Sequence, residues 1–233
     1  MRIAIPVAVL TLSMAIWAQA QSGPPALCKP CLFYGGDLNP DDVNAAIFPN
    51  EDTLSVVALT YGSIHVPKNR IILVEGLLIQ TVIEHGNELD PQTASWQIRT
   101  NILNGTGGTQ VGGGNGYVHM QPTGRQFNGY PEYTIAGKVG PIQLSGGGVP
   151  GGTDYWINLL PDCTHRRDTE CKDVNYYASN TTQETNSVNG FAQNVGQIVL
   201  EGPHESWSLC YDDGYSGTQC GALSFGIMGT VVQ

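Results

Sequence analysis

The sequence predicts a single-domain, all-β protein, an antiparallel β-sandwich or jelly roll with glycine-rich loops and short-range disulfides. Short segments alternate apolar with polar residues, which is the period of a half-buried strand. The 30 glycines fall in clusters between these segments and are typical of tight turns. Single β domains of about 200–250 residues are common, so the length fits one domain once a leader is removed.

The first residues have the pattern of a secretory leader. Met1-Arg2 precedes an apolar run over residues 3–18, and the small residues of Ala18-Gln19-Ala20 suit a signal peptidase. The run is shorter than the roughly 20 residues that span a bilayer. We expect cleavage near Ala20, a secreted, periplasmic or cell-surface location, and no membrane span in the mature chain. The expected organisation is a signal peptide (1–20), a Pro/Asx-rich N-terminal segment (21–52) and a β-sandwich domain (53–233).

The first strand signals follow residue 52, after a segment that reads as irregular. Residues 53–61 are apolar on both faces, which predicts a fully buried strand. Residues 71–83 form a long apolar run rich in Ile and Val, and Glu75-Gly76 marks a bulge or bend within it. Residues 95–103 show the cleanest alternation and are followed by a turn at residues 104–108.

The rest of the chain reads as short strands separated by glycine. Gly112–Gly116 is interpreted as a loop, and Gly146–Gly152 as a flexible connection. The polar stretch Asp162–Asn194 is long and weakly patterned, which is typical of functional or mobile segments. The further predicted strands cover residues 117–121, 132–139, 142–144, 155–160, 197–200, 207–211 and 223–232.

The cysteines fall as neighbours along the chain. In an exported protein such spacing indicates disulfides, each stabilising by roughly 2–3 kcal/mol for loops this short. Two alternatives remain open: a zinc site around His165 and a redox role for the Cys-Lys-Pro-Cys segment. The expected neighbouring pairs are Cys28 with Cys31, Cys163 with Cys171, and Cys210 with Cys220.

The charge balance narrows the class of partner. Ten basic against twenty acidic residues give a net charge of −10. An acidic chain repels phosphate backbones, so we expect no nucleic-acid partner. Glycans or envelope components remain candidate partners for an exported protein of this kind.

Several motifs resemble a known group of proteins. They are Phe33-Tyr34-Gly35-Gly36-Asp37, Trp96-Gln97-Ile98-Arg99, Pro122-Thr123-Gly124-Arg125, Glu132-Tyr133-Thr134 and the segment 155–163. Their order resembles that in a group of uncharacterised exported bacterial β-sandwich proteins, some of which carry a C-terminal sorting tail. The resemblance spans most of the mature chain. It implies a sandwich fold and an extracellular or cell-surface setting, and it transfers no catalytic residue.

Two groups of side chains suggest ligand binding. Oxygen-bearing residues in an acidic loop suit calcium, although the EF-hand pattern is not met and an Asx-rich turn explains the same residues. Tyr176 and Tyr177 look least like strand residues, so they are the better candidates for stacking on a sugar. The candidate calcium ligands are Asp37, Asn39, Asp41 and Asp42.

No catalytic constellation is evident, and we expect a protein that is not an enzyme. Ser216 lacks the second glycine of a nucleophile elbow. The carboxylates in or near strands show no close pairing on one face, and we interpret them as solvated: Glu75, Glu84, Glu132, Asp154 and Glu201. The sequence thus favours a structural or adhesive exported protein, then a carbohydrate-binding module, then a secreted hydrolase.

Overall fold

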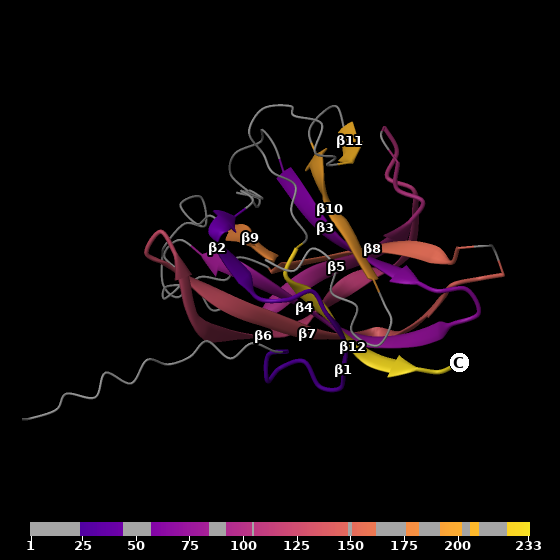
Figure 1. Cartoon of the computed structure of the whole chain (residues 1–233), viewed down its shortest axis with the longest axis horizontal. Coiled ribbons are helices and arrows are strands. Elements are labelled where there is room, and N and C mark those ends of the chain that lie inside the picture. The colour runs from indigo at the N-terminus through magenta and orange to yellow at the C-terminus, as the bar shows by residue number, and fades with distance from the viewer. Residues whose placement is uncertain are drawn as a thin grey trace, which may run out of the picture.

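The computed structural model describes residues 24–43, 57–83, 92–103, 105–148, 151–161, 176–181, 192–201, 206–209 and 223–233. These residues contain strands and no helix, as Figure 1 shows. The strands are β1 Cys31–Tyr34, β2 Leu38–Val43, β3 Val57–Val66, β4 Ile71–Ile83, β5 Thr93–Thr100, β6 Thr109–Phe127, β7 Tyr130–Ser145, β8 Thr153–Pro161, β9 Tyr176–Thr181, β10 Ala192–Glu201, β11 Ser206–Leu209 and β12 Phe225–Val231.

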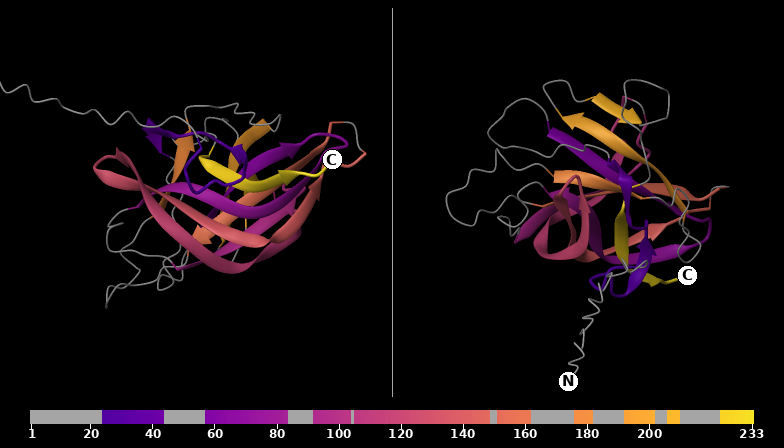
Figure 2. Two further views of the ribbon diagram at one scale, coloured as in Figure 1. Left: turned by 90° about the horizontal axis from the view of Figure 1, so that it is seen from below. Right: turned by 60° about the vertical axis from the view of Figure 1, so that its left-hand side comes forward.

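The strands join into one antiparallel sheet in the order β1-β12-β4-β7-β6-β5-β8-β3-β10-β11, with β9 pairing both β4 and β2. The long strand β6 makes the sheet continuous, because its first half pairs with β5 and its second half with β7. Figure 2 shows the sheet curling, with β6 and β7 sweeping along one side. The predicted all-β, antiparallel class is therefore confirmed.

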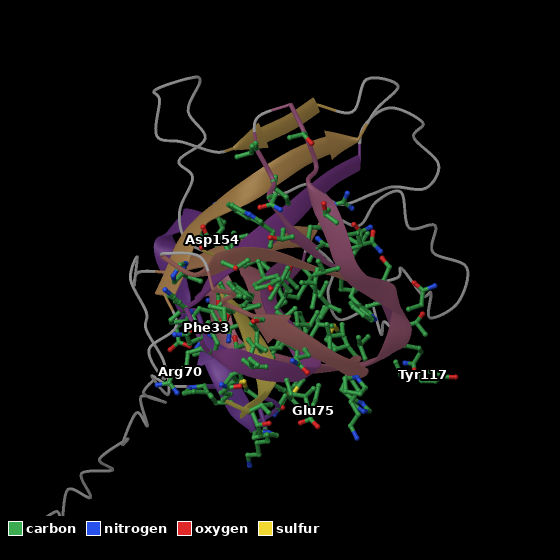
Figure 3. The ribbon with its side chains drawn as sticks, turned by 90° about the vertical axis from the view of Figure 1, so that its right-hand side faces the viewer. Phe33, Arg70, Glu75, Tyr117 and Asp154 are labelled. Carbon is green, nitrogen blue, oxygen red and sulfur yellow. A yellow bond between two sulfur atoms is a disulfide. The ribbon has the colours of Figure 1, made fainter. Side chains whose placement is uncertain are left out.

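The main core fills the inside of this curl. Phe33 of β1 and Phe225 of β12 lie with ring centroids 5.0 Å apart. A Cβ atom on Gly62 of β3 would come within 2.4 Å of the Phe225 ring, so β3 and β12 pack face to face. Figure 3 shows Phe33 among the interior side chains, while Glu75 and Tyr117 point outward.

A smaller second core lies outside the sheet, beneath the residues that precede β1. The cluster consists of Cys28, Tyr34, Leu78, Ala136 and Met228. Burying these side chains fixes the N-terminal residues against β4, β7 and β12, since buried apolar area stabilises by about 25 cal/mol per Å².

The strand predictions hold best where long apolar runs occur. Residues 71–83 form β4 with the predicted bounds, and the pairing register shifts at Glu75 as the bulge prediction requires. The connection predicted at Gly146–Gly152 lies between β7 and β8 wherever it is described.

The loop predicted at Gly112–Gly116 is wrong, since these residues lie within β6 and pair with β5. The physical reason is close packing. A Cβ on Gly112 would lie 2.7 Å from the Ile142 Cδ1 atom and 3.3 Å from the Trp96 ring. Here glycine makes room for a buried indole rather than for a turn.

The prediction that the N-terminal segment is irregular is wrong, since this segment contributes β1 and β2 to the sheet. Four-residue and Asp-rich strands carry too little alternation to be detected by period, so tertiary pairing decides them. Among the described residues, no helix is long and apolar enough to cross a membrane.

Candidate binding site

A row of polar side chains crosses the outer face of β4, β7 and β6. Gln80 of β4 pairs in register with Thr134 of β7, and Thr134 pairs with Gln121 of β6. Alternate residues of a strand share a face, so the Leu78–Ala136 pair of the second core lies beside this row. The polar row lines the pocket described below, and the apolar row carries the covering segment.

That covering segment, residues 24–31, is here called the disulfide segment. Cys28 and Cys31 are bonded with an S–S distance of 2.10 Å, which confirms one of the predicted pairs. Cys28 is buried against Leu78 and Ala136, and its amide donates to the Pro25 carbonyl at 2.9 Å. Residues of this segment line the pocket together with the polar row.

Arg125 lines the same pocket as the disulfide segment, and each nitrogen of its guanidinium group has a partner. Nε donates to Glu132 Oε2 at 2.7 Å, Nη1 lies 3.1 Å from Asp37 Oδ1, and Nη2 donates to Gln80 Oε1 at 3.0 Å. Burial tends to lower the pKa of Arg125, but the charges of Glu132 and Asp37 outweigh it, and the pKa is raised. Arg125 therefore remains charged.

Glu132 is fully buried, with no exposed surface. Besides Arg125, its carboxylate accepts a hydrogen bond from the Thr123 hydroxyl at 2.7 Å. The interpretation of Glu132 as a solvated carboxylate is thus wrong. A buried carboxylate needs a charged, hydrogen-bonding partner, and Arg125 of β6 is that partner.

Asp37 is held by Arg125 and by the Tyr34 hydroxyl, which donates to Oδ1 at 2.6 Å. Burial, and then the hydrogen bond to Asp37, raise the pKa of Tyr34 far above its usual value. Ser224, just before β12, donates toward Gln80 Oε1 at 2.6 Å and toward the Gly36 carbonyl. The Arg125 network is defined as Tyr34, Asp37, Gln80, Thr123, Arg125, Glu132 and Ser224.

The disulfide segment, the polar row and Arg125 line a pocket of about 390 Å³. Its volume falls within the range of small-molecule sites. Among the described residues that line it, none is aromatic. They are Pro24, Pro25, Ala26, Cys28, Lys29, Asp37, Gln80, Gln121, Pro122, Thr123, Arg125 and Thr134.

Two buried polar groups of the pocket lack a partner within the described part of the chain. Gln80, only 2% exposed, uses its amide oxygen to accept from Arg125 and Ser224, which leaves its amide nitrogen unpaired. Thr134, 3% exposed, makes no side-chain hydrogen bond to a described residue. Buried polar groups are paired in the large majority of cases, so two such groups lining one pocket make it the candidate binding site.

A second polar pair lies elsewhere, at the ends of β3 and β8. His65 Nδ1 lies 2.7 Å from Asp154 Oδ1, and the two side chains are 31% and 46% exposed. The described residues contain no group of three or more histidine, cysteine, aspartate or glutamate side chains that could hold a metal ion. Both side chains of this pair are therefore in contact with solvent.

The residues predicted to bind a sugar or calcium do not lie where the sequence predicted them. Tyr176 and Tyr177 lie on β9 and pair with Ile83 and Val82, so the prediction that they stand outside strands is wrong. Their side chains lie outside the described part. Of the candidate calcium ligands, Asp37 binds Arg125, while Asn39, Asp41 and Asp42 lie on the strand β2 and not in a loop.

Other predicted residues fall outside the described ones or stand apart from the pocket. Cys163, Cys171, Cys210, Cys220, Ser216 and Glu84, and the signal peptide, all lie outside the described residues. Glu75 is exposed on β4, and Glu201 ends β10. Three segments of the resemblance, containing Asp37, Arg125 and Glu132, do come together in the Arg125 network.

Sequence reasoning missed Arg125, Gln80 and Thr134. A signal is present in the sequence: Gln80 interrupts an apolar run, and Glu132 and Thr134, two residues apart, lie on one face of a strand.

Comparison with known proteins adds nothing to this site, because no protein-family model, no curated protein and no solved structure matches the chain.

Proposed function

We propose that this protein is exported and has a structural or adhesive role outside the cytoplasm, without catalysing a reaction. The pairing of Arg125 supports this proposal most directly. Its guanidinium nitrogens are all held within the protein, and it engages both carboxylates beside the pocket, Asp37 and Glu132. A glycosidase needs two carboxylates that face its substrate as acid and base or nucleophile. Carboxylates held by a guanidinium group are not free to act as such a catalytic pair.

Export is tested by expressing the full chain and sequencing the N-terminus of the released protein. We expect the mature chain to begin at Gln21, because the leader ends in Ala18-Gln19-Ala20. Retention of the intact leader in the cell would contradict export.

The absence of catalysis is tested with the purified mature chain and chromogenic ester, glycoside and peptide substrates. We expect no turnover above background. A turnover that disappears in both Asp37→Asn and Glu132→Gln, while the variants stay folded, would establish a hydrolase and overturn the proposal.

The finer assignment of the fold as a β-sandwich or jelly roll also belongs to the proposal. It is supported by the face-to-face packing of Gly62 on β3 against Phe225 on β12. This contact sets one part of the curled sheet over another, as a sandwich requires.

A carbohydrate-binding module is the second candidate, and the polar pocket favours it. Sugar stacking on Tyr176 and Tyr177, which lie on β9, is a separate hypothesis for such a module. Loss of glycan binding in Tyr176→Ala or Tyr177→Ala would support the aromatic site, and unchanged binding in both would reject it.

A further inference from the structure

We infer that the pocket between the disulfide segment and Arg125 binds a saccharide. The inference adds a ligand class to the proposed extracellular role and relies on that role only for the setting. It rests first on two donors that have no partner among the described residues, the Gln80 amide nitrogen and the Thr134 hydroxyl, which both line the pocket and are almost wholly buried. A ligand that supplies acceptors to both groups removes the cost of leaving them unsatisfied.

The donors are held in place before any ligand arrives. Arg125 and Ser224 both donate to the Gln80 oxygen, which fixes the orientation of that amide and turns its nitrogen away from them. Asp37 is likewise held through one carboxylate oxygen by Tyr34 and Arg125. Groups fixed in advance lose little conformational entropy on binding, so even a few hydrogen bonds give measurable affinity.

The mixture of donors and acceptors favours hydroxyl groups as the ligand chemistry. Gln80 and Thr134 donate, Asp37 accepts, and the exposed Gln121 amide does both. A sugar hydroxyl also donates and accepts, so neighbouring hydroxyls on a ring match such a lining. The rings of Pro24, Pro25 and Pro122 supply aliphatic surface for the C–H face of a sugar.

Two other ligand classes fit less well. An anion is disfavoured because the Arg125 charge is already offset by two carboxylates, Glu132 and Asp37. A peptide adding to the sheet is disfavoured because the pocket floor is a sheet face. At this row the edges of β7 are paired with β4 and β6, which leaves no free edge on that strand.

The test begins with the purified mature chain on a printed array of neutral and uronic-acid-containing oligosaccharides. The strongest binder is then titrated calorimetrically against Thr134→Val and Gln121→Ala. Thr100→Val is the matched control, because its hydroxyl contacts the Asp154 carbonyl away from the pocket. We expect Kd to rise about fivefold to tenfold in each pocket variant, which is the loss of one hydrogen bond. The control should bind like the parent protein.

The melting temperature separates a binding role from a structural one. Thr134→Val should melt within about 3 °C of the parent, because the hydroxyl that it removes has no described partner. A drop of more than about 5 °C would show that the hydroxyl stabilises the fold, and would overturn the inference. Retention of no oligosaccharide, or unchanged Kd in both pocket variants, would also overturn it. None of these three results affects the proposed exported, non-catalytic role, because that role is tested by export and by turnover.

Discussion

Replacing Arg125 with methionine is expected to destabilise the protein more than any surface substitution. Methionine keeps an unbranched apolar stem but leaves Glu132, which has no exposed surface, without its cation. Removing one partner of a buried ion pair costs about 3–5 kcal/mol. The Thr123 hydroxyl still donates to Glu132, so we expect the lower end, about 3 kcal/mol.

This loss is measured as the free energy of unfolding in urea, followed by tryptophan fluorescence, with the m-value unchanged. The melting temperature should fall by about 6–12 °C, since 1 kcal/mol shifts it by about 2–4 °C in a chain of this size. Arg70→Met is the matched control, because Arg70 is exposed, stands at the edge of the molecule in Figure 3 and makes no side-chain hydrogen bond or ion pair with a described residue. We expect a change within about 0.5 kcal/mol there.

The double variant Arg125→Met/Glu132→Gln isolates the ion pair. Removing the charge of residue 132 should restore part of the stability that Arg125→Met loses, with a coupling energy of about 2 kcal/mol, within the range that double-mutant cycles find for contacting residues. Additive single changes, or an Arg125→Met variant within about 1 kcal/mol of the parent, would refute the reasoning that Arg125 neutralises a buried carboxylate.

Three further changes test the surrounding structure. Replacing Cys28 and Cys31 with serine should cost about 2 kcal/mol in urea unfolding, because the disulfide restricts the unfolded chain; an unchanged midpoint would argue against this. Gly62→Ala should cost about 1–3 kcal/mol by overpacking Phe225, and Phe225→Leu in the same chain should recover part of it; additive losses would reject the contact. Stability should fall as the pH rises above about 10, because unfolded tyrosine ionises there while the raised pKa of Tyr34 keeps the folded form protonated. The free energy of unfolding in urea, measured between pH 9 and about 11, should fall less steeply with pH in Tyr34→Phe than in the parent protein. An equal dependence on pH in the two proteins would contradict this explanation.

The strands that sequence reasoning predicts well are those whose own residues decide their structure. Residues 71–83 combine β-branched side chains with length, and residues 155–160 are apolar on both faces, so burial and period agree. The glycines of β6 were misread because a single sequence does not show that Trp96 packs over them. Strands β1 and β2 depend on partners far along the chain, β12 and β9, and their own period is weak.

The residues of the candidate site were harder to predict from the sequence than the strands. Asp37, Arg125 and Glu132 are ordinary charged residues in sequence, and only the register of β4, β7 and β6 and the position of the disulfide segment bring them together. A polar residue inside an apolar run, such as Gln80, is a local sign that the outer face of the strand is covered. Pairing over such separations depends on topology, which residue types alone do not specify.

We propose that the polar row beneath the disulfide segment is the surface that binds the ligand. Side-chain amide resonances in ¹H–¹⁵N NMR spectra test it most directly, recorded while the array-selected oligosaccharide is titrated into the labelled mature protein. We predict that the amide groups of Gln80 and Gln121 shift first and saturate together, since both line the pocket. Shifts confined to β9, β10 and β11, with the Gln80 amide unmoved, would contradict the claim.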